Sequence, residues 1–250
     1  MDAEKKATPT PATMRRGRRL GSKLPARGAG VNELQDPEEP AREEGGDAHG
    51  ADPEPPDRLA PPRRLVPLAL AFYGAMLGLA LGLRGLLTGG SLLFADAAAA
   101  ERGIAWPADA ALGGLAAALV ILASRELTRR TRYGAALARS LARALGPLGP
   151  GQCLALALAS GIGEEALFRG ALQPSLGWIG ASLLFGLAHL VPRRELLAWS
   201  VFALVAGLLL GGLFAWSGNL LAPILAHVLV NAVNLRLLTR ESQAPPGARR

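Results

Sequence analysis

Long stretches without a formally charged residue constrain the fold of this chain more than any other feature of its sequence. Residues 196–235 contain no Asp, Glu, Lys or Arg over forty positions, and residues 65–83 contain none over 19. A helix rises about 1.5 Å per residue, so about 20 apolar residues cross the roughly 30 Å hydrocarbon core of a bilayer. The longer stretch is enough for two crossings, with a natural break at residues 217–219. These lengths predict a membrane protein.

Other apolar stretches extend this prediction to an all-α, polytopic transmembrane helical bundle of six spans, or of up to eight if residues 86–100 or 134–145 also enter the bilayer. Residues 133–145 are too short to cross, and Arg139 and Arg143 lie four positions apart on one face. That pattern is typical of an amphipathic helix at the membrane interface. The six expected spans are 65–83, 104–124, 144–163, 170–192 and two within 196–235.

The charges are unevenly distributed along the chain. Its 27 Lys and Arg against 20 Asp and Glu give a net charge of +7, and residues 1–64 carry 12 of each sign. The excess positive charge therefore belongs to the apolar body, so it does not indicate a nucleic-acid-binding surface and we expect no nucleic-acid partner. Arginine-rich segments follow every second expected span, which predicts an even number of spans with both termini in the cytoplasm.

Residues 1–64 contain ten prolines and no apolar periodicity. Such a segment cannot bury enough surface to offset its ordering entropy, so we expect a disordered cytoplasmic tail. Its basic half, residues 5–27, is a solvated spacer or, less favoured, a segment that lies on anionic lipid. No apolar stretch precedes Leu65, which argues against a secretory signal peptide. The expected organisation is a tail at 1–64, two N-terminal transmembrane helices at 65–132, a catalytic membrane domain at 133–240 and a C-terminal tail at 241–250.

Few ionisable side chains lie inside the expected spans, and such groups are candidates for function because burying them is costly. Glu165 and Arg169 are four residues apart, so they share a helix face and can form an ion pair. Glu164 points about 100° away from that face. Without a counter-charge in a dry site, it is the candidate general base.

Histidines and an asparagine supply the other candidate groups. His227 and Asn231 share a face of the last span, and His189 ends an earlier one. With Glu164 they can activate a water molecule and stabilise an oxyanion. Hydropathy places His189 nearer the cytoplasmic end of its span than Glu164 is in its own, so a shared depth requires an offset or irregular helix. The alternative is a non-catalytic membrane scaffold, immunity or docking protein in which the same residues only hold helices together.

Three motifs in these segments resemble those of one protease family. Residues 164–170 (EEALFRG) resemble its EExxxR motif, residues 185–189 (FGLAH) its FxxxH motif and residues 227–231 (HVLVN) its HxxxN motif. The family is that of the CPBP intramembrane proteases, also called the Abi or CAAX-protease family, which includes the type II CAAX prenyl endopeptidases. The resemblance covers about residues 145–240.

The resemblance implies an intramembrane endopeptidase that cleaves near the C-terminal end of a membrane-anchored protein or peptide. It allows roles in removal of C-terminal sorting signals or in bacteriocin maturation and immunity. The amino-acid composition suggests a bacterium with a GC-rich genome, so we expect the protein in the bacterial inner membrane. The sequence leaves the oligomeric state open. The implied roles are Glu164 as base, His189 as orienter of the water, His227 and Asn231 as stabilisers of the oxyanion, and Glu165, Arg169 and Phe185 as supports of the site.

Some of these residues also fit two other protease chemistries. The family is often labelled a metalloprotease, and Glu164, His189 and His227 are a His₂Glu set of the kind that binds zinc. The resemblance favours a metal-independent mechanism without a cofactor, and the sequence has no HExxH motif. A cysteine protease would need Cys153, the only cysteine, which precedes Glu164 by eleven residues. That separation is about 16 Å along a helix, so we expect a small buried apolar side chain instead.

Overall fold

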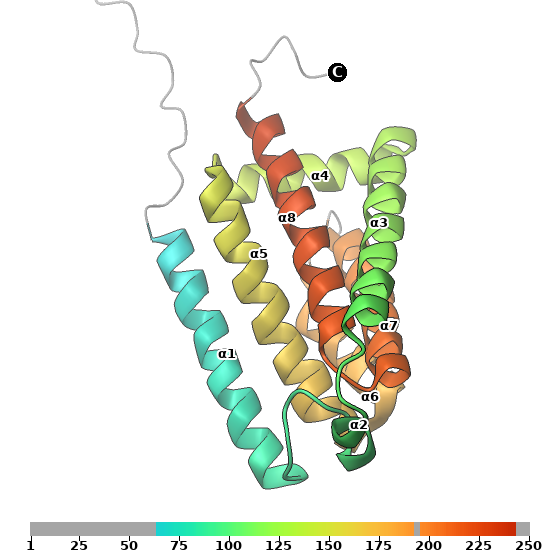
Figure 1. Ribbon diagram of the computed structural model, residues 1–250. Helices are drawn as coiled ribbons and strands as arrows, with labels where there is room; N and C mark the ends of the chain where they lie inside the picture. Colours follow the sequence, from blue (N-terminus) through green and yellow to red (C-terminus); the bar gives the residue numbers. More distant parts are fainter. Residues whose placement is uncertain (1–63, 193–195, 244–250) are drawn as a thin grey trace, which may run out of the picture. The chain divides into compact units, whose positions relative to one another are not determined.

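The computed structural model describes residues 64–192 and 196–243, and the side chains of residues 64–192 and 196–240. The expected disordered tail at 1–64 therefore lies outside the described residues except for Arg64, and so does most of the expected C-terminal tail. Within the described ranges the chain is a bundle of helices (Figure 1). The expected all-α fold is confirmed.

Nine helical elements follow one another in the described part of the chain. Five helical segments are long and apolar enough, by length and composition, to cross a membrane: Leu65–Leu87, Trp106–Arg130, Pro150–Ala188, Leu197–Ser217 and Leu221–Arg240. The chain is thus a multi-pass membrane protein. The elements are α1 (Leu65–Leu87), α2 (Ala97–Arg102), α3 (Trp106–Arg130), α4 (Arg132–Leu145), α5 (Pro150–Glu165), η1 (Ala166–Leu172), α6 (Gln173–Ala188), α7 (Leu197–Ser217) and α8 (Leu221–Gln243).

Five candidate spans stand against the expected six because the helical run Pro150–Ala188 counts once, although it consists of two helices that meet at Gly177. This run folds back on itself at Gly177, whose backbone has φ 72° and ψ 169°. The reversal is visible at Gly207, because its carbonyl oxygen accepts hydrogen bonds from both Arg169 and Ser182, one before and one after the turn. After the turn only residues 178–188 remain in α6. They are about 16 Å long, too short to cross a bilayer alone.

The packing order places α8 at the centre of the bundle. α8 lies between α3 and α5, while α1 packs along α5 and η1 (Figure 1). α6 packs against α7 and against η1 on the far side of the bundle. Large apolar side chains such as Leu68, Leu119 and Trp216 point outward. An apolar exterior, with the few buried charged side chains turned inward among apolar ones, is the arrangement expected of a bundle in lipid.

Glycines allow two of these contacts to be unusually close. A Cβ atom on Gly161 would lie 2.6 Å from Cγ2 of Val228, and one on Gly163 would lie 3.0 Å from the carbonyl oxygen of Tyr73. The backbone of α5 therefore approaches α8 at Gly161 and α1 at Gly163. Both glycines lie within the turn that precedes Glu164, so α8 and α1 approach α5 closely beside this residue.

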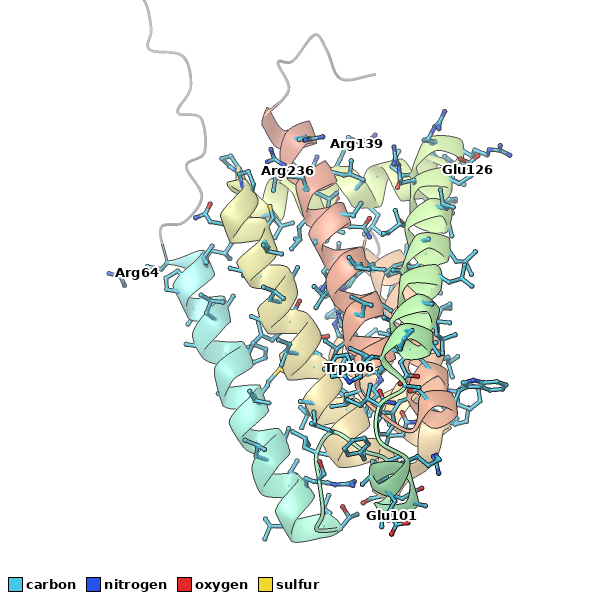
Figure 2. The ribbon with its side chains drawn as sticks, viewed as in Figure 1. Arg64, Glu101, Trp106, Glu126, Arg139 and Arg236 are labelled. Atoms are coloured by element: carbon cyan, nitrogen blue, oxygen red, sulfur yellow. The ribbon has the colours of Figure 1, made fainter. Side chains whose placement is uncertain are left out.

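α4 lies across the end of the bundle at which α1 begins (Figure 1). It is amphipathic, as expected: Ala138 and Ala142 are buried, whereas Arg139 and Arg143 are exposed. Arg64, Arg139 and Arg236 are found at this end and Glu101 at the other (Figure 2). The expected assignment of the arginine-rich end to the cytoplasm stays a prediction.

Candidate active site

Glu164 and Glu165 end α5, at the point where the α-helix becomes the π-helix η1. A π-helical turn is rare and leaves backbone carbonyls imperfectly paired, and such turns occur frequently at functional sites. The EExxxR residues therefore straddle a change of helical pitch. Glu164 is 7% exposed, while Glu165 and Arg169 are fully buried.

Glu165 contacts two cationic or potentially cationic partners with its two carboxylate oxygens. Oε2 lies 3.2 Å from Nε of Arg169, an ion pair without good hydrogen-bond geometry. Oε1 accepts a hydrogen bond of 2.7 Å from Nδ1 of His227. The expected pairing of Glu165 with Arg169 is present, and η1 adds a second anchor because Nη2 of Arg169 donates to the carbonyl oxygen of Gly207 at 3.0 Å.

Glu164 faces both intramembrane histidines. Its Oε2 lies 3.6 Å from Nε2 of His189 and 3.9 Å from Nε2 of His227. These distances are too long for direct hydrogen bonds, and Oε2 is buried without a hydrogen-bond partner. Three polar atoms from α5, α6 and α8 thus converge on one small volume. A water molecule held between them would satisfy all three.

The hydrogen bonds on the far side of each imidazole decide which nitrogen faces Glu164. Nδ1 of His189 lies 2.8 Å from the carbonyl oxygen of Phe185. A carbonyl and a carboxylate can only accept, so Nδ1 carries the proton in His189 and in His227 alike. In each ring Nε2 is therefore left to face the site.

Phe185 lies between the imidazole of His189 and the guanidinium of Arg169. Its ring centroid lies 4.5 Å from that of His189, and Cζ of Arg169 lies 4.4 Å from the same ring. A guanidinium over an aromatic face is stabilised by the ring quadrupole. The phenylalanine of the FxxxH segment thereby fixes the depth of His189 opposite Glu164. The turn at Gly177 and the π-helix supply the irregularity that a shared depth requires.

The sequence reasoning missed two side chains of this region. Ser160, one turn before Glu164 on α5, is buried, and its Oγ accepts a hydrogen bond of 2.8 Å from Nδ2 of Asn231. Tyr73 of α1 interacts with the carboxylate of Glu164. The only sequence signal for Ser160 is its helical spacing of four from Glu164. Tyr73 is a single tyrosine among the apolar residues of 65–83, and nothing in the sequence marked it as part of the site.

An apolar cavity of about 470 Å³ ends at these groups. The expected residues Glu164, Phe185, His189, His227 and Asn231 all line it, together with Ser160 and Tyr73. Its other lining residues are mostly Leu, Ala and Val side chains from α1, α3, α4, α5, α7 and α8. Polar atoms gathered in one part of an apolar cavity are the usual arrangement of a site that orients a largely apolar ligand.

The zinc site and the cysteine protease, the two alternatives to a glutamate-activated water, can be compared with the positions of their residues. No group of three or more His, Cys, Asp or Glu side chains in the described part of the chain is arranged to hold a metal ion. Glu164, His189 and His227 therefore do not fit a zinc site as they lie here. Cys153 is buried with Leu148 and Leu156, and it does not line the cavity. This confirms its expected place as a small buried side chain.

Comparison with known proteins identifies the segment that carries the site. Residues 147–233 match the family model described as type II CAAX prenyl endopeptidase Rce1-like. The uncharacterized protein YpbD of Bacillus subtilis (strain 168) is 41% identical over 80 residues, which are 31% of this chain and 41% of that protein. The chain thus spans less than half the length of this curated relative. No solved structure matches significantly. The resemblance read from the three motifs is confirmed: residues 147–233 match a domain model of the CAAX-protease family.

Proposed function

With an Rce1-like domain over residues 147–233 as the premise, we propose that this protein is an intramembrane endopeptidase in which Glu164 activates a water molecule. The observation that carries the proposal is the convergence of Oε2 of Glu164 with Nε2 of His189 and of His227, at 3.6 and 3.9 Å. A buried carboxylate oxygen without a partner, faced by two imidazoles, is suited to bind and polarise water.

The reaction begins with removal of a proton from this water by Glu164 while the water oxygen attacks the carbonyl carbon of the scissile peptide. His189 orients the water through Nε2, which accepts a hydrogen bond because its Nδ1 carries the proton. The carbonyl π bond opens and the oxygen becomes negatively charged. Glu164 then delivers its proton to the amide nitrogen as the C–N bond breaks, which yields a new carboxyl group and a new amine.

The oxyanion is stabilised by donors from α8. Asn231 supplies an amide N–H, and His227 supplies Nε2–H when its ring is an imidazolium, since its other N–H is directed to Glu165. Charge balance supports that protonation state. With His227 positive, the formal charges of the two glutamates, Arg169 and His227 sum to zero. A buried site without net charge avoids a large desolvation penalty.

The substrate class follows from the cavity. An apolar chamber of about 470 Å³ that reaches from α1 and α4 to the polar groups accommodates an extended apolar segment, not a charged soluble peptide. We therefore propose cleavage near the C-terminal end of a membrane-anchored protein or peptide, in the inner membrane of a bacterium. Removal of sorting signals and maturation of small exported peptides both fit this class.

The test is a comparison of membrane proteomes from cells that carry the wild type, Glu164→Gln or Glu126→Gln. Glu126 is a half-buried glutamate paired with Arg130 on α3, away from the cavity, so its replacement controls for loss of a carboxylate. We expect substrates with an intact C-terminal segment to accumulate with Glu164→Gln only. Normal cleavage by a Glu164→Gln protein that inserts at wild-type levels would favour the scaffold alternative, in which these polar residues only join helices.

A further inference from the structure

Ser160 is tied to Asn231 by a short relay of two hydrogen bonds. Its Oγ donates to the carbonyl oxygen of Ala157 at 3.3 Å and accepts from Nδ2 of Asn231 at 2.8 Å. Ser160 is 5% exposed, and it belongs to none of the three motifs that indicate the family. The relay joins α5, which carries Glu164, to α8, which carries His227.

This relay determines which end of the Asn231 amide faces Ser160. Because the single hydroxyl proton of Ser160 is directed to Ala157, Oγ can only accept from Asn231. The amide must therefore present its NH₂ group, and not its carbonyl oxygen, to α5. An NH₂ group has two N–H donors, and Ser160 uses one of them. The second remains free beside the cavity that Asn231 lines.

The helix packing makes the relay short and leaves little room for another residue. A Cβ atom on Gly161 would meet Val228 at 2.6 Å from Cγ2 and 3.2 Å from the backbone nitrogen. α5 and α8 are thus in near-backbone contact immediately beside Ser160. At this separation the short serine side chain spans the gap to Asn231.

We propose that Ser160 is a positioning residue for the oxyanion donor: it fixes the Asn231 amide so that its second N–H is aimed at the developing oxyanion. The proposal rests on the proposed peptidase function. Without Ser160 the amide is free to rotate about its last torsion and to present its carbonyl oxygen, which repels an oxyanion. The effect should therefore fall on the transition state and hardly on substrate binding.

The main experiment measures kcat and KM of purified protein in lipid for Ser160→Ala and for the matched control Ser124→Ala. Ser124 of α3 also donates to a carbonyl three residues back, Ile121, and also contacts an asparagine of α8, Asn234 at 3.4 Å. Loss of one oxyanion donor costs about 100-fold or more in kcat, so its misorientation should cost on the order of 10-fold. We expect that fall in kcat for Ser160→Ala with KM changed less than about twofold, and wild-type values for Ser124→Ala.

A double-mutant cycle separates positioning from a general structural role. In an Asn231→Ala background, Ser160→Ala should cause no further fall in kcat, because the group that it positions is absent. An independent structural effect would instead multiply with that of Asn231→Ala. Ser160→Cys provides a second variant of similar volume, in case Ser160→Ala accumulates poorly. Its thiol is a weak acceptor, so kcat should again fall.

The outcomes distinguish this inference from the proposed function. Wild-type kcat in both Ser160 variants, or equal falls with and without Asn231, would overturn the role of Ser160 while Glu164→Gln remains inactive. If Glu164→Gln cleaves normally, the peptidase function itself fails and the positioning role fails with it.

Discussion

Glu165 accepts a hydrogen bond of 2.7 Å from Nδ1 of His227, and this contact determines that Nε2 of the imidazole faces the cavity. The same carboxylate lies 3.2 Å from Nε of Arg169, in a place where all three side chains are shielded from solvent. Glu165 thus holds a histidine through one oxygen and is itself held by an arginine through the other. Glu165 therefore positions His227, whereas Glu164 is the proposed base.

Glu165→Gln is expected to destabilise the protein strongly, because it leaves the guanidinium of Arg169 buried without a counter-charge. Breaking a buried ion pair from one side costs about 3–5 kcal/mol. The double variant Glu165→Gln/Arg169→Gln removes both charges and should recover much of that loss. Thermal unfolding in detergent measures the stability of each variant.

Activity separates the two roles of Glu165. In the double variant the protein should be stable, yet cleavage should remain low because no carboxylate supports the His227 imidazolium. Wild-type cleavage by the stable double variant would show that Glu165 has only a structural task. A double variant as unstable as Glu165→Gln alone would contradict the ion-pair argument.

Tyr73 gives α1 a direct part in the site, although α1 lies outside the matched residues 147–233. Its side chain lines the cavity and interacts with Glu164, and Gly163 lets its backbone pack against α5. Tyr73→Phe keeps the ring and removes the hydroxyl that supports the carboxylate. We expect kcat to fall on the order of 10-fold, as for the loss of a hydrogen bond to a charged group of about 1.5 kcal/mol.

Tyr133→Phe is the matched control for Tyr73→Phe, because Tyr133 is exposed on α4 and is 71% accessible. It should cleave at the wild-type rate in the same lipid assay. Equal activity of Tyr73→Phe and the wild type would mean that α1 contributes only packing to the site.

Much of this site could be predicted because a membrane makes polar residues rare. Glu164, His189, His227 and Asn231 stood out in segments otherwise free of charge, and the helical spacing of Glu165 and Arg169 correctly indicated their ion pair. What spacing could not give was contact between helices. The relay from Ser160 to Asn231 depends on how closely α5 and α8 cross, which is a property of packing and not of either segment alone.

Hydropathy also could not predict where residues 150–188 turn. Two apolar segments, 144–163 and 170–192, were expected to cross separately, and they form one run that turns at Gly177. The sequence around Gly177 is apolar on both sides, so composition does not mark the turn. The need for an irregular helix near His189 could be inferred, but the position of the turn could not.

Gly177→Ala tests the turn. A backbone with φ 72° and ψ 169° is essentially restricted to glycine, and placing another residue there costs about 1–3 kcal/mol. We expect a lower thermal midpoint together with reduced cleavage, because the turn brings His189 back to the depth of Glu164. Gly82→Ala is the control, since Gly82 lies within α1 and no atom lies within 4 Å of an added Cβ. Similar losses in both variants would contradict a special role for Gly177.

Metal removal tests the zinc alternative. Glu164, His189 and His227 do not form a metal-holding group as they lie here, and the proposed mechanism uses the carboxylate of Glu164 as the base. A zinc enzyme loses activity when a chelator strips the ion and regains it when zinc is restored. We expect the purified protein to retain its full rate of cleavage after dialysis against a strong chelator, and elemental analysis to find far less than one zinc per chain. Inactivation by the chelator that zinc reverses would instead establish the histidines and Glu164 as ligands, and would remove Glu164 from the role of base.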